Sequence, residues 1–190
     1  MKQKTLKYQL TGVAPLLMHN ARLSDPLDEF SKEMKKIHSK MKKTEADYEE
    51  LARLEFLGGL YTEKDHPVIT GEMVEGMLVE SAKKVREGKL FRAAVYSEGC
   101  FPLEYEGPKT SDELWKNERF QLRRSVGIKG NRVIRTRPMF SDWHVDITVV
   151  YVHGEVEPGK IDLALERASN LIGLGDWRPK YGRFSVRKLN

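Results

Sequence analysis

The chain has 190 residues, with 33 Lys and Arg against 28 Asp and Glu, a formal net charge of +5 and a hydrophobic content of 39%. This length predicts one domain with room for an insertion, and the dense apolar segments exclude a wholly disordered chain. The longest apolar run, residues 13–18, is far shorter than the roughly 20 residues that cross a bilayer, so no membrane partner is expected. The single cysteine, Cys100, excludes an intramolecular disulfide and indicates a reducing, cytoplasmic location.

The first predicted elements are a strand and an amphipathic helix. Residues 4–13 alternate between apolar and polar side chains, which is the pattern of a half-buried strand. A helix follows over residues 26–43, with Asp25 as its N-cap and apolar side chains at steps of three and four. Lysines cover its outer face, and a solvated face explains them more simply than a contact with phosphate.

A second helix is predicted to begin after Thr44, because Asp47 stands where a capping box needs an acceptor. Its apolar face is expected to contain Tyr48, Leu51, Leu54 and Leu57. The two helices together predict a helical hairpin, inserted as residues 20–66 after the first strand.

The middle of the chain predicts a third helix and several short elements. Thr70 is the expected N-cap of this helix, and Gly88 is the expected end. Residues 90–96 fit a helix or a strand equally well. A short strand is expected at residues 101–105 and one helical turn at residues 111–115.

Two strand-like runs, residues 120–128 and 132–137, are joined through Lys129-Gly130-Asn131 and predict a β-hairpin. We call residues 119–138 the basic hairpin. Residues 143–152 form the strongest strand pattern of the chain, apolar on both sides, and should lie at the centre of a sheet.

A fourth helix is expected from Pro158 to Ile172, with Gly173 as its C-terminal cap, and a last strand at residues 181–186. Without the helical hairpin, the order of elements fits an α+β fold with a ferredoxin-like (RRM-like) β-α-β-β-α-β core. We therefore expect a single domain over residues 1–190 that carries the inserted helical hairpin and the basic hairpin.

The basic hairpin is the first candidate site. Between Arg119 and Ser141 there are seven Lys and Arg residues and no Asp or Glu. Arginine predominates, and its planar guanidinium suits phosphate oxygens and stacks on bases. The candidate nucleic-acid-binding residues are Arg123, Arg124, Lys129, Arg132, Arg135 and Arg137. The alternative is a soluble hairpin whose basic edge prevents association between sheets.

The second candidate site is the segment Gly-Leu-Gly-Asp-Trp-Arg-Pro-Lys-Tyr-Gly-Arg-Phe at residues 173–184, which we call the glycine-rich loop. Glycines let a backbone approach an anion and expose amides to it, and aromatic rings next to cations suit single-stranded nucleic acid. The candidate residues are Gly173, Gly175, Trp177, Arg178, Lys180, Tyr181 and Arg183. A helix cap followed by a tight turn is the alternative interpretation.

A loop of the form G-x-G…Y-G-R-F between the last helix and the last strand resembles that of the RAMP superfamily, the CRISPR-associated RNA-binding proteins. Residues 68–77, Val-Ile-Thr-Gly-Glu-Met-Val-Glu-Gly-Met, look like the segment that opens the first core helix in those proteins. Arg137-Pro138, followed by Trp143 and the glycine-rich loop, is similar to phage-encoded relatives of that fold. The resemblance covers residues 4–18 and 67–188.

This resemblance implies a modified RNA-recognition fold that holds single-stranded RNA, often in a filament of repeated subunits. It also implies that the glycine-rich loop and the basic hairpin lie on the nucleic-acid face. Two departures stand against it: the chain is shorter than the usual backbone subunit, and residues 20–66 match no known part of the family.

We therefore expect a cytoplasmic protein that binds single-stranded RNA or DNA, with RNA favoured, and that can assemble as a homo-oligomer along the strand. No cofactor or metal is expected. One alternative is a RAMP-like endoribonuclease in which His19 acts as general acid or base. Another is a protein-interaction or structural module. A binding protein is favoured over an enzyme, and the choice between RNA and DNA stays open.

Overall fold

The computed structural model describes residues 2–128 and 130–190, without the side chain of Ile128. The chain divides into two compact units, and each contains helices and antiparallel strands. The α+β class is therefore confirmed. Unit 1 comprises Met1–Leu16, Val68–Glu106 and Phe140–Asn190, and unit 2 comprises Leu17–Pro67 and Gly107–Met139.

A four-stranded antiparallel sheet forms the centre of unit 1, in the order β10-β1-β9-β5. The strands are β1 (Gln3–Gly12), β5 (Val95–Tyr96), β9 (His144–Val152) and β10 (Phe184–Lys188). Leu10 of β1 lies opposite Val145 of β9 on one side and Val186 of β10 on the other. The predicted first strand and the predicted central strand are confirmed.

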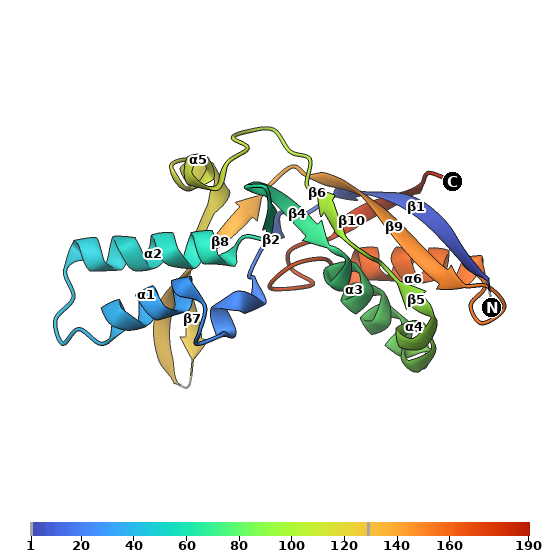
Figure 1. Cartoon of the computed structure of the whole chain (residues 1–190), viewed down its shortest axis with the longest axis horizontal. Helices are drawn as coiled ribbons and strands as arrows, with labels where there is room; N and C mark the ends of the chain where they lie inside the picture. The colour runs from blue at the N-terminus through green and yellow to red at the C-terminus, as the bar shows by residue number, and fades with distance from the viewer. Residues whose placement is uncertain (1, 129) are drawn as a thin grey trace. The chain divides into compact units, whose positions relative to one another are not determined.

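Three helices of unit 1 lie against one face of this sheet: α3 (Gly71–Lys83), α4 (Gly88–Ala94) and α6 (Pro158–Leu171) (Figure 1). On this face the hydroxyl of Tyr8 donates to Asp162 of α6 at 2.7 Å. Burial, together with the Asp162 carboxylate, raises the pKa of Tyr8. As predicted, Thr70 caps α3, and its side chain accepts from the N–H of Met73.

The predicted end of the third helix at Gly88 is wrong, because Gly88 begins α4. The chain turns between α3 and α4. Arg86 has φ +63°, and the N–H of Glu87 donates to the carbonyl of Ala82 at 2.9 Å. The ambiguous residues 90–96 thus form the end of α4 followed by β5. In unit 1, the end of β4 (His66–Thr70) also pairs with β6 (Cys100–Pro102).

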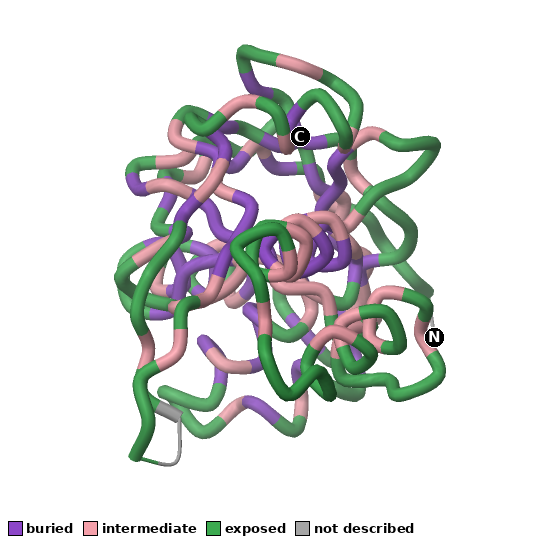
Figure 2. Tube along the Cα trace, turned by 90° about the vertical axis from the view of Figure 1, so that its left-hand side faces the viewer, coloured by how far each residue is buried: buried purple, intermediate pink, exposed green. Residues whose placement is uncertain are grey.

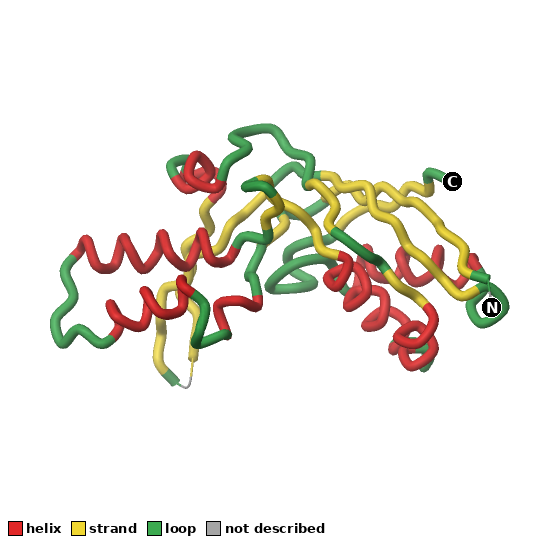
Figure 3. Tube along the Cα trace, in the orientation of Figure 1, coloured by secondary structure: helices red, strands yellow, loops and turns green. Residues whose placement is uncertain are grey.

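Unit 2 consists of a helical hairpin, a β-hairpin and short connecting elements (Figure 3). Its sheet has the order β2-β8-β7, and a short β3 pairs with the beginning of β4. The elements are β2 (Leu16–Leu17), η1 (Ala21–Ser24), α1 (Glu29–His38), α2 (Glu45–Gly59), β3 (Thr62–Glu63), α5 (Ser111–Trp115), η2 (Glu118–Phe120), β7 (Gln121–Ile128) and β8 (Asn131–Phe140). The predicted β-hairpin and the helical turn at residues 111–115 are confirmed.

The first helix of the hairpin is shorter than predicted at both ends. Asp25 forms a turn by accepting from the N–H of Leu27, and Asp28 is the N-cap of α1. At the other end, the ammonium of Lys43 binds the carbonyls of His38 and Lys40 and caps the helix early. The apolar spacing of the sequence did not predict these ends, because it continues on both sides of the residues that form the helix.

The second helix begins as predicted, with a full capping box between Thr44 and Asp47. Its predicted apolar face is correct in part: Leu54 is buried and Leu51 and Leu57 are half-buried, but Tyr48 does not belong to the buried face. Tyr48 is 57% exposed, whereas Ala52, Glu55 and Phe56 are buried, and Phe56 packs 5.4 Å from the ring of Trp115. The buried face also contains a glutamate, which a hydrophobic pattern could not predict.

Candidate nucleic-acid interface

The basic hairpin holds its arginines on both faces of a two-stranded ribbon. Arg124 of β7 lies directly opposite Arg135 of β8, and Arg123 lies opposite Thr136. Because successive residues of a strand alternate between faces, Arg123 and Arg132 project from the face opposite to Arg124. The outer half of the hairpin is exposed (Figure 2). Lys129 lies outside the described residues.

Three of the predicted residues, Arg123, Arg124 and Arg132, are exposed. Within residues 2–128 and 130–190, none of the three has an ion-pair partner. Each guanidinium carries five N–H donors that suit an anion with several acceptor oxygens. These three side chains are therefore available to phosphate groups.

Arg137 has a different role. It is buried, and its guanidinium donates to Glu55 of α2 at 2.8 Å. The other oxygen of Glu55 accepts from the N–H of Thr136 at 2.8 Å, and Arg135 lies 3.5 Å from the first oxygen. We therefore leave Arg137 out of the candidate surface and regard Arg135 as partly neutralised.

No local sequence pattern reveals this neutralisation, because the acid lies far away along the chain. Residues 119–141 contain no Asp or Glu, yet α2 supplies a carboxylate to their buried end. A buried arginine without a counter-charge would be costly, so a partner for Arg137 was needed from elsewhere. The basic character of the hairpin is concentrated toward its tip.

The glycine-rich loop is closed by its own backbone. Gly173 and Gly182 have φ values of +78° and +72°, and the N–H of Leu174 donates to the carbonyl of Gly182 at 2.8 Å. A Cβ on Gly182 would stand 1.7 Å from the carbonyl oxygen of Leu174. The N–H of Gly173 donates to Ala168 of α6 at 2.8 Å, so this amide is engaged inside the fold.

These contacts favour the helix cap and tight turn as the role of Gly173, and we leave it out of the candidate surface. They also explain the late start of the last strand. The N–H of Gly182 donates to the carbonyl of Pro15 at 2.8 Å, and the carbonyl of Arg183 accepts from Val13 and Ala14. The predicted strand over residues 181–186 is therefore displaced to Phe184–Lys188.

The side chains of the loop bring together rings and cations. The rings of Trp177 and Tyr181 are 6.2 Å apart and tilted by 57°. The ammonium of Lys180 lies 5.8 Å from the ring centre of Tyr181, within cation–π range. Arg178 and Arg183 are exposed. Gly175, Trp177 and Arg178 line a cavity of about 470 Å³. Glu80 of α3 and Lys84, which follows α3, also line it, so both signs of charge are present.

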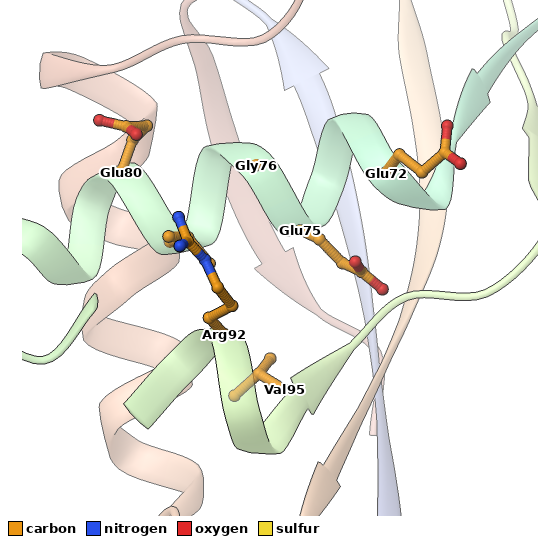
Figure 4. Close-up of a pocket in the computed structure, with 7 residues that line it drawn as sticks. Glu72, Glu75, Gly76, Glu80, Arg92 and Val95 are labelled. Carbon is orange, nitrogen blue, oxygen red and sulfur yellow. The ribbon is translucent and has the colours of Figure 1, made fainter. Parts of the chain in front are cut away.

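Two other surfaces of unit 1 are unsuited to phosphate or to base stacking. A pocket of about 240 Å³ is lined by Glu72, Glu75 and Glu80 of α3 with Arg92 of α4 (Figure 4). On the open face of the sheet, Gln9 donates to Asp146 at 2.9 Å and accepts from Arg187 at 2.8 Å. This polar ladder stands where a stacking platform on central strands would need aromatic rings.

The nuclease candidate His19 follows β2 in unit 2 and is half-buried. Its carbonyl accepts from the hydroxyl of Tyr61 at 3.4 Å. In the described part of the chain, no three or more His, Cys, Asp or Glu side chains are grouped so that they could hold a metal ion. Cleavage of RNA through His19 stays a prediction.

No protein-family model matches the chain, and no curated protein matches its sequence. The described helices also include none with the length and apolar character that a membrane crossing requires. The residues of the two candidate surfaces are therefore the basis of the functional argument.

Proposed function

We propose that this protein binds single-stranded nucleic acid, with RNA as the favoured strand. The exposed arginines of the basic hairpin carry the proposal. Arg124 lies directly opposite Arg135, whose charge Glu55 offsets only in part from 3.5 Å, and like charges at opposite positions of an antiparallel pair cost free energy. A bound phosphate would offset that repulsion and would receive bidentate hydrogen bonds from the guanidinium groups.

The glycine-rich loop supplies the second part of the proposed interface. Arg178, Lys180 and Arg183 would contact the phosphate backbone, and Trp177 or Tyr181 would stack on bases. Gly175 lines the adjoining cavity and would allow a nucleic-acid backbone to approach, because it has no side chain. Capture in this scheme is electrostatic and tolerant of sequence.

The ferredoxin-like core and the relationship to the RAMP superfamily belong to the same proposal. In unit 1, β1 is followed by α3, α4 and β5, and β9 is followed by α6 and β10. Together with the sheet order β10-β1-β9-β5, this succession supports a split β-α-β arrangement. Because the open sheet face is polar at its centre, we assign the nucleic acid to the hairpin and the loop.

The test is a fluorescence anisotropy titration of the whole protein with matched single-stranded RNA and DNA oligomers at two salt concentrations. A variant with Arg123, Arg124 and Arg132 changed to Ala should bind more weakly. The slope of log affinity against log salt should fall by about 0.7 for each phosphate-binding side chain removed.

The matched control changes Lys32, Lys35 and Lys42 to Ala, which removes the same charge from the exposed surface of the helical hairpin. The control should keep most of the wild-type affinity. Equal losses in the two variants would reject the hairpin as the site. On a denaturing gel the RNA should stay intact, and cleavage that disappears in His19→Ala would replace the proposal with a nuclease.

Assembly along the strand is the further part of the proposal that the family resemblance suggests. Sedimentation of the protein with RNA oligomers of increasing length should then show the number of bound copies rising with length. One copy per strand at every length would remove the filament from the proposal and leave the binding activity in place.

A further inference from the structure

A groove of about 510 Å³ lies within unit 2, between the helical hairpin and β8. Its apolar lining comes from Met34, Tyr48 and Leu51 of the helices and from Val133 and Ile134 of the strand. We call it the hairpin groove. Its volume falls in the range of sites for small organic ligands, for which an apolar lining with few polar groups is typical.

The charged side chains that line the hairpin groove are mainly cations: Lys43, Arg123, Arg132 and Arg135. Glu55 is the one acidic residue among its described lining residues, and its carboxylate already binds Arg137 and the N–H of Thr136. Arg123 and Arg132 have no counter-charge in the described structure. The groove therefore complements a ligand that is both apolar and anionic.

Two apolar side chains of the groove are unusually open to water. Tyr48 is 57% exposed and Ile134 is 58% exposed. Tyr48 lies outside the buried face of α2, and Ile134 is an exposed residue of β8. An exposed ring next to arginines offers a flat surface on which a planar ligand can stack.

The edge of β8 adds hydrogen-bonding groups. The N–H of Thr136 donates to Glu55, and the carbonyl of Pro138 accepts from Met18, so both point away from β7. In an antiparallel pair this orientation alternates along the strand, so the N–H and C=O of Ile134 and Arg132 point the same way. These groups lie at the hairpin groove and have no hydrogen-bond partner among the described residues.

We propose that the hairpin groove holds one unstacked nucleobase of the bound strand. The base would lie against Tyr48 and Ile134, its polar edge would face the backbone of Ile134, and the flanking phosphates would lie on Arg123 and Arg132. This inference rests on the proposed function and adds to it a site that recognises bases. A ligand made only of phosphates would leave the apolar lining uncovered.

The test compares two labelled strands of the same length, an oligouridine of roughly ten nucleotides and an abasic phosphodiester strand. Wild-type protein should bind the oligouridine about tenfold more tightly than the abasic strand, because stacking contributes only when a base is present. Tyr48→Ala should reduce this preference to the part that Trp177 and Tyr181 contribute, and it should leave the affinity for the abasic strand unchanged. Tyr48→Phe should retain the preference.

Leu163→Ala is the matched control, since Leu163 on α6 is 58% exposed and lies outside the groove. It should leave the preference intact. An unchanged preference in Tyr48→Ala would overturn the base site while the proposed function stands. Equal binding of the two strands by the wild type would overturn the base site and the stacking on Trp177 or Tyr181, and it would leave the electrostatic capture in place. If wild type bound neither strand, or if the triple arginine variant bound both as before, the proposed function itself would fail and the inference with it.

A polyglutamate peptide is the last probe, because the edge of β8 could also pair with an extended acidic segment. Weak binding that is insensitive to Tyr48→Ala is expected. Binding as tight as that of oligouridine, and abolished in Tyr48→Ala, would assign the groove to an acidic peptide and overturn the proposal.

Discussion

Glu55 shows how one buried carboxylate can set the role of several arginines. It binds Arg137 at 2.8 Å and the backbone of Thr136, and it stands 3.5 Å from Arg135. The arginines beyond these contacts keep their donors for other ligands. A local sequence window cannot reveal such a division, because α2 and β8 are far apart along the chain.

Glu55→Gln tests this role, since it removes the charge and keeps the shape of the side chain. Arg137 would then be buried without a counter-charge, which typically costs about 3–5 kcal/mol. Because the amide oxygen can still accept one hydrogen bond, we expect the free energy of unfolding to fall by about 3 kcal/mol in urea denaturation.

The matched control is Glu50→Gln, which breaks a partly exposed pair with Arg53 on the same helix. Pairs of this kind contribute about 1 kcal/mol or less. Similar decreases in the two variants would mean that the contact between Glu55 and Arg137 is no stronger than a surface pair.

Residue roles that depend on near neighbours in the chain were predicted better than roles that depend on distant ones. Thr44, Asp47 and Thr70 were predicted correctly as capping residues, because a capping side chain and its hydrogen-bond partner lie only three residues apart. Asp25 was predicted as a cap and instead forms a turn. Two acidic residues three positions apart both suit a helix start, and only the backbone chooses between Asp25 and Asp28.

At the scale of elements, the start of α2 carries a titratable cap. The Lys40 ammonium, followed by the backbone N–H of Thr44, lowers the pKa of Asp47 from 3.8 to about 2. Because this pKa is lower in the folded chain than in the unfolded one, the charged carboxylate stabilises the fold above about pH 3.8. The contribution disappears as the pH falls through about 2.

We therefore expect wild type to be more stable than Asp47→Asn above pH 3.8, with a difference that shrinks as the pH approaches 2. Thermal unfolding of the two proteins across this range measures it. Lys40→Gln should raise the pKa of Asp47 in an NMR titration, and Lys42→Gln should leave it in place. A difference in stability independent of pH would contradict the charged capping box.

The helix α3 has an exposed glycine in its interior. Gly76 lies between Glu72 and Glu80 at the surface pocket of Figure 4, and a Cβ added there would meet nothing within 4 Å. Gly76→Ala should therefore raise the free energy of unfolding by about 0.5–1 kcal/mol, because alanine loses less backbone entropy in a helix.

Gly182→Ala is the opposite case in the same unit, since its Cβ would overlap the carbonyl oxygen of Leu174 and its φ is +72°. It should lower the free energy of unfolding. Urea denaturation of both variants checks the pair, and a decrease in stability in Gly76→Ala would show that the surface of α3 has a packing role that these contacts do not reveal.

Element types were predicted better than element ends and faces. The hairpin, the central strand and the capped helices follow local periodicity and turn residues, which the sequence contains in full. The burial of α2 depends on Trp115 and on the arginines of β8, and neither belongs to the window from which its face was predicted. Contacts with distant parts of the chain therefore determine which face of α2 is buried, including the position of its charged residue Glu55.

For the whole molecule, the two candidate surfaces fall into different compact units. The basic hairpin lies in unit 2 and the glycine-rich loop lies in unit 1. The order of elements predicted the α+β class, because strands and helices alternate along the chain. It could not predict that the inserted helices and the basic hairpin would pack together, since this depends on contacts such as Glu55 with Arg137.

If both surfaces bind one strand, affinity should depend steeply on its length. A short oligomer engages one surface, and a longer one makes the second contact intramolecular, which raises affinity without any new type of interaction. We expect wild-type affinity to rise in a step as oligouridine is lengthened. The step should vanish both in the triple hairpin variant and in a variant with Arg178, Lys180 and Arg183 changed to Ala.

Anisotropy titrations over a series of lengths measure this step, and the salt dependence provides an independent check. In a combined variant the slope should fall by about as much as in the two separate variants together, at about 0.7 for each phosphate-binding side chain removed. A length step that persists in either variant would mean that the two surfaces bind different strands, or that only one of them binds nucleic acid.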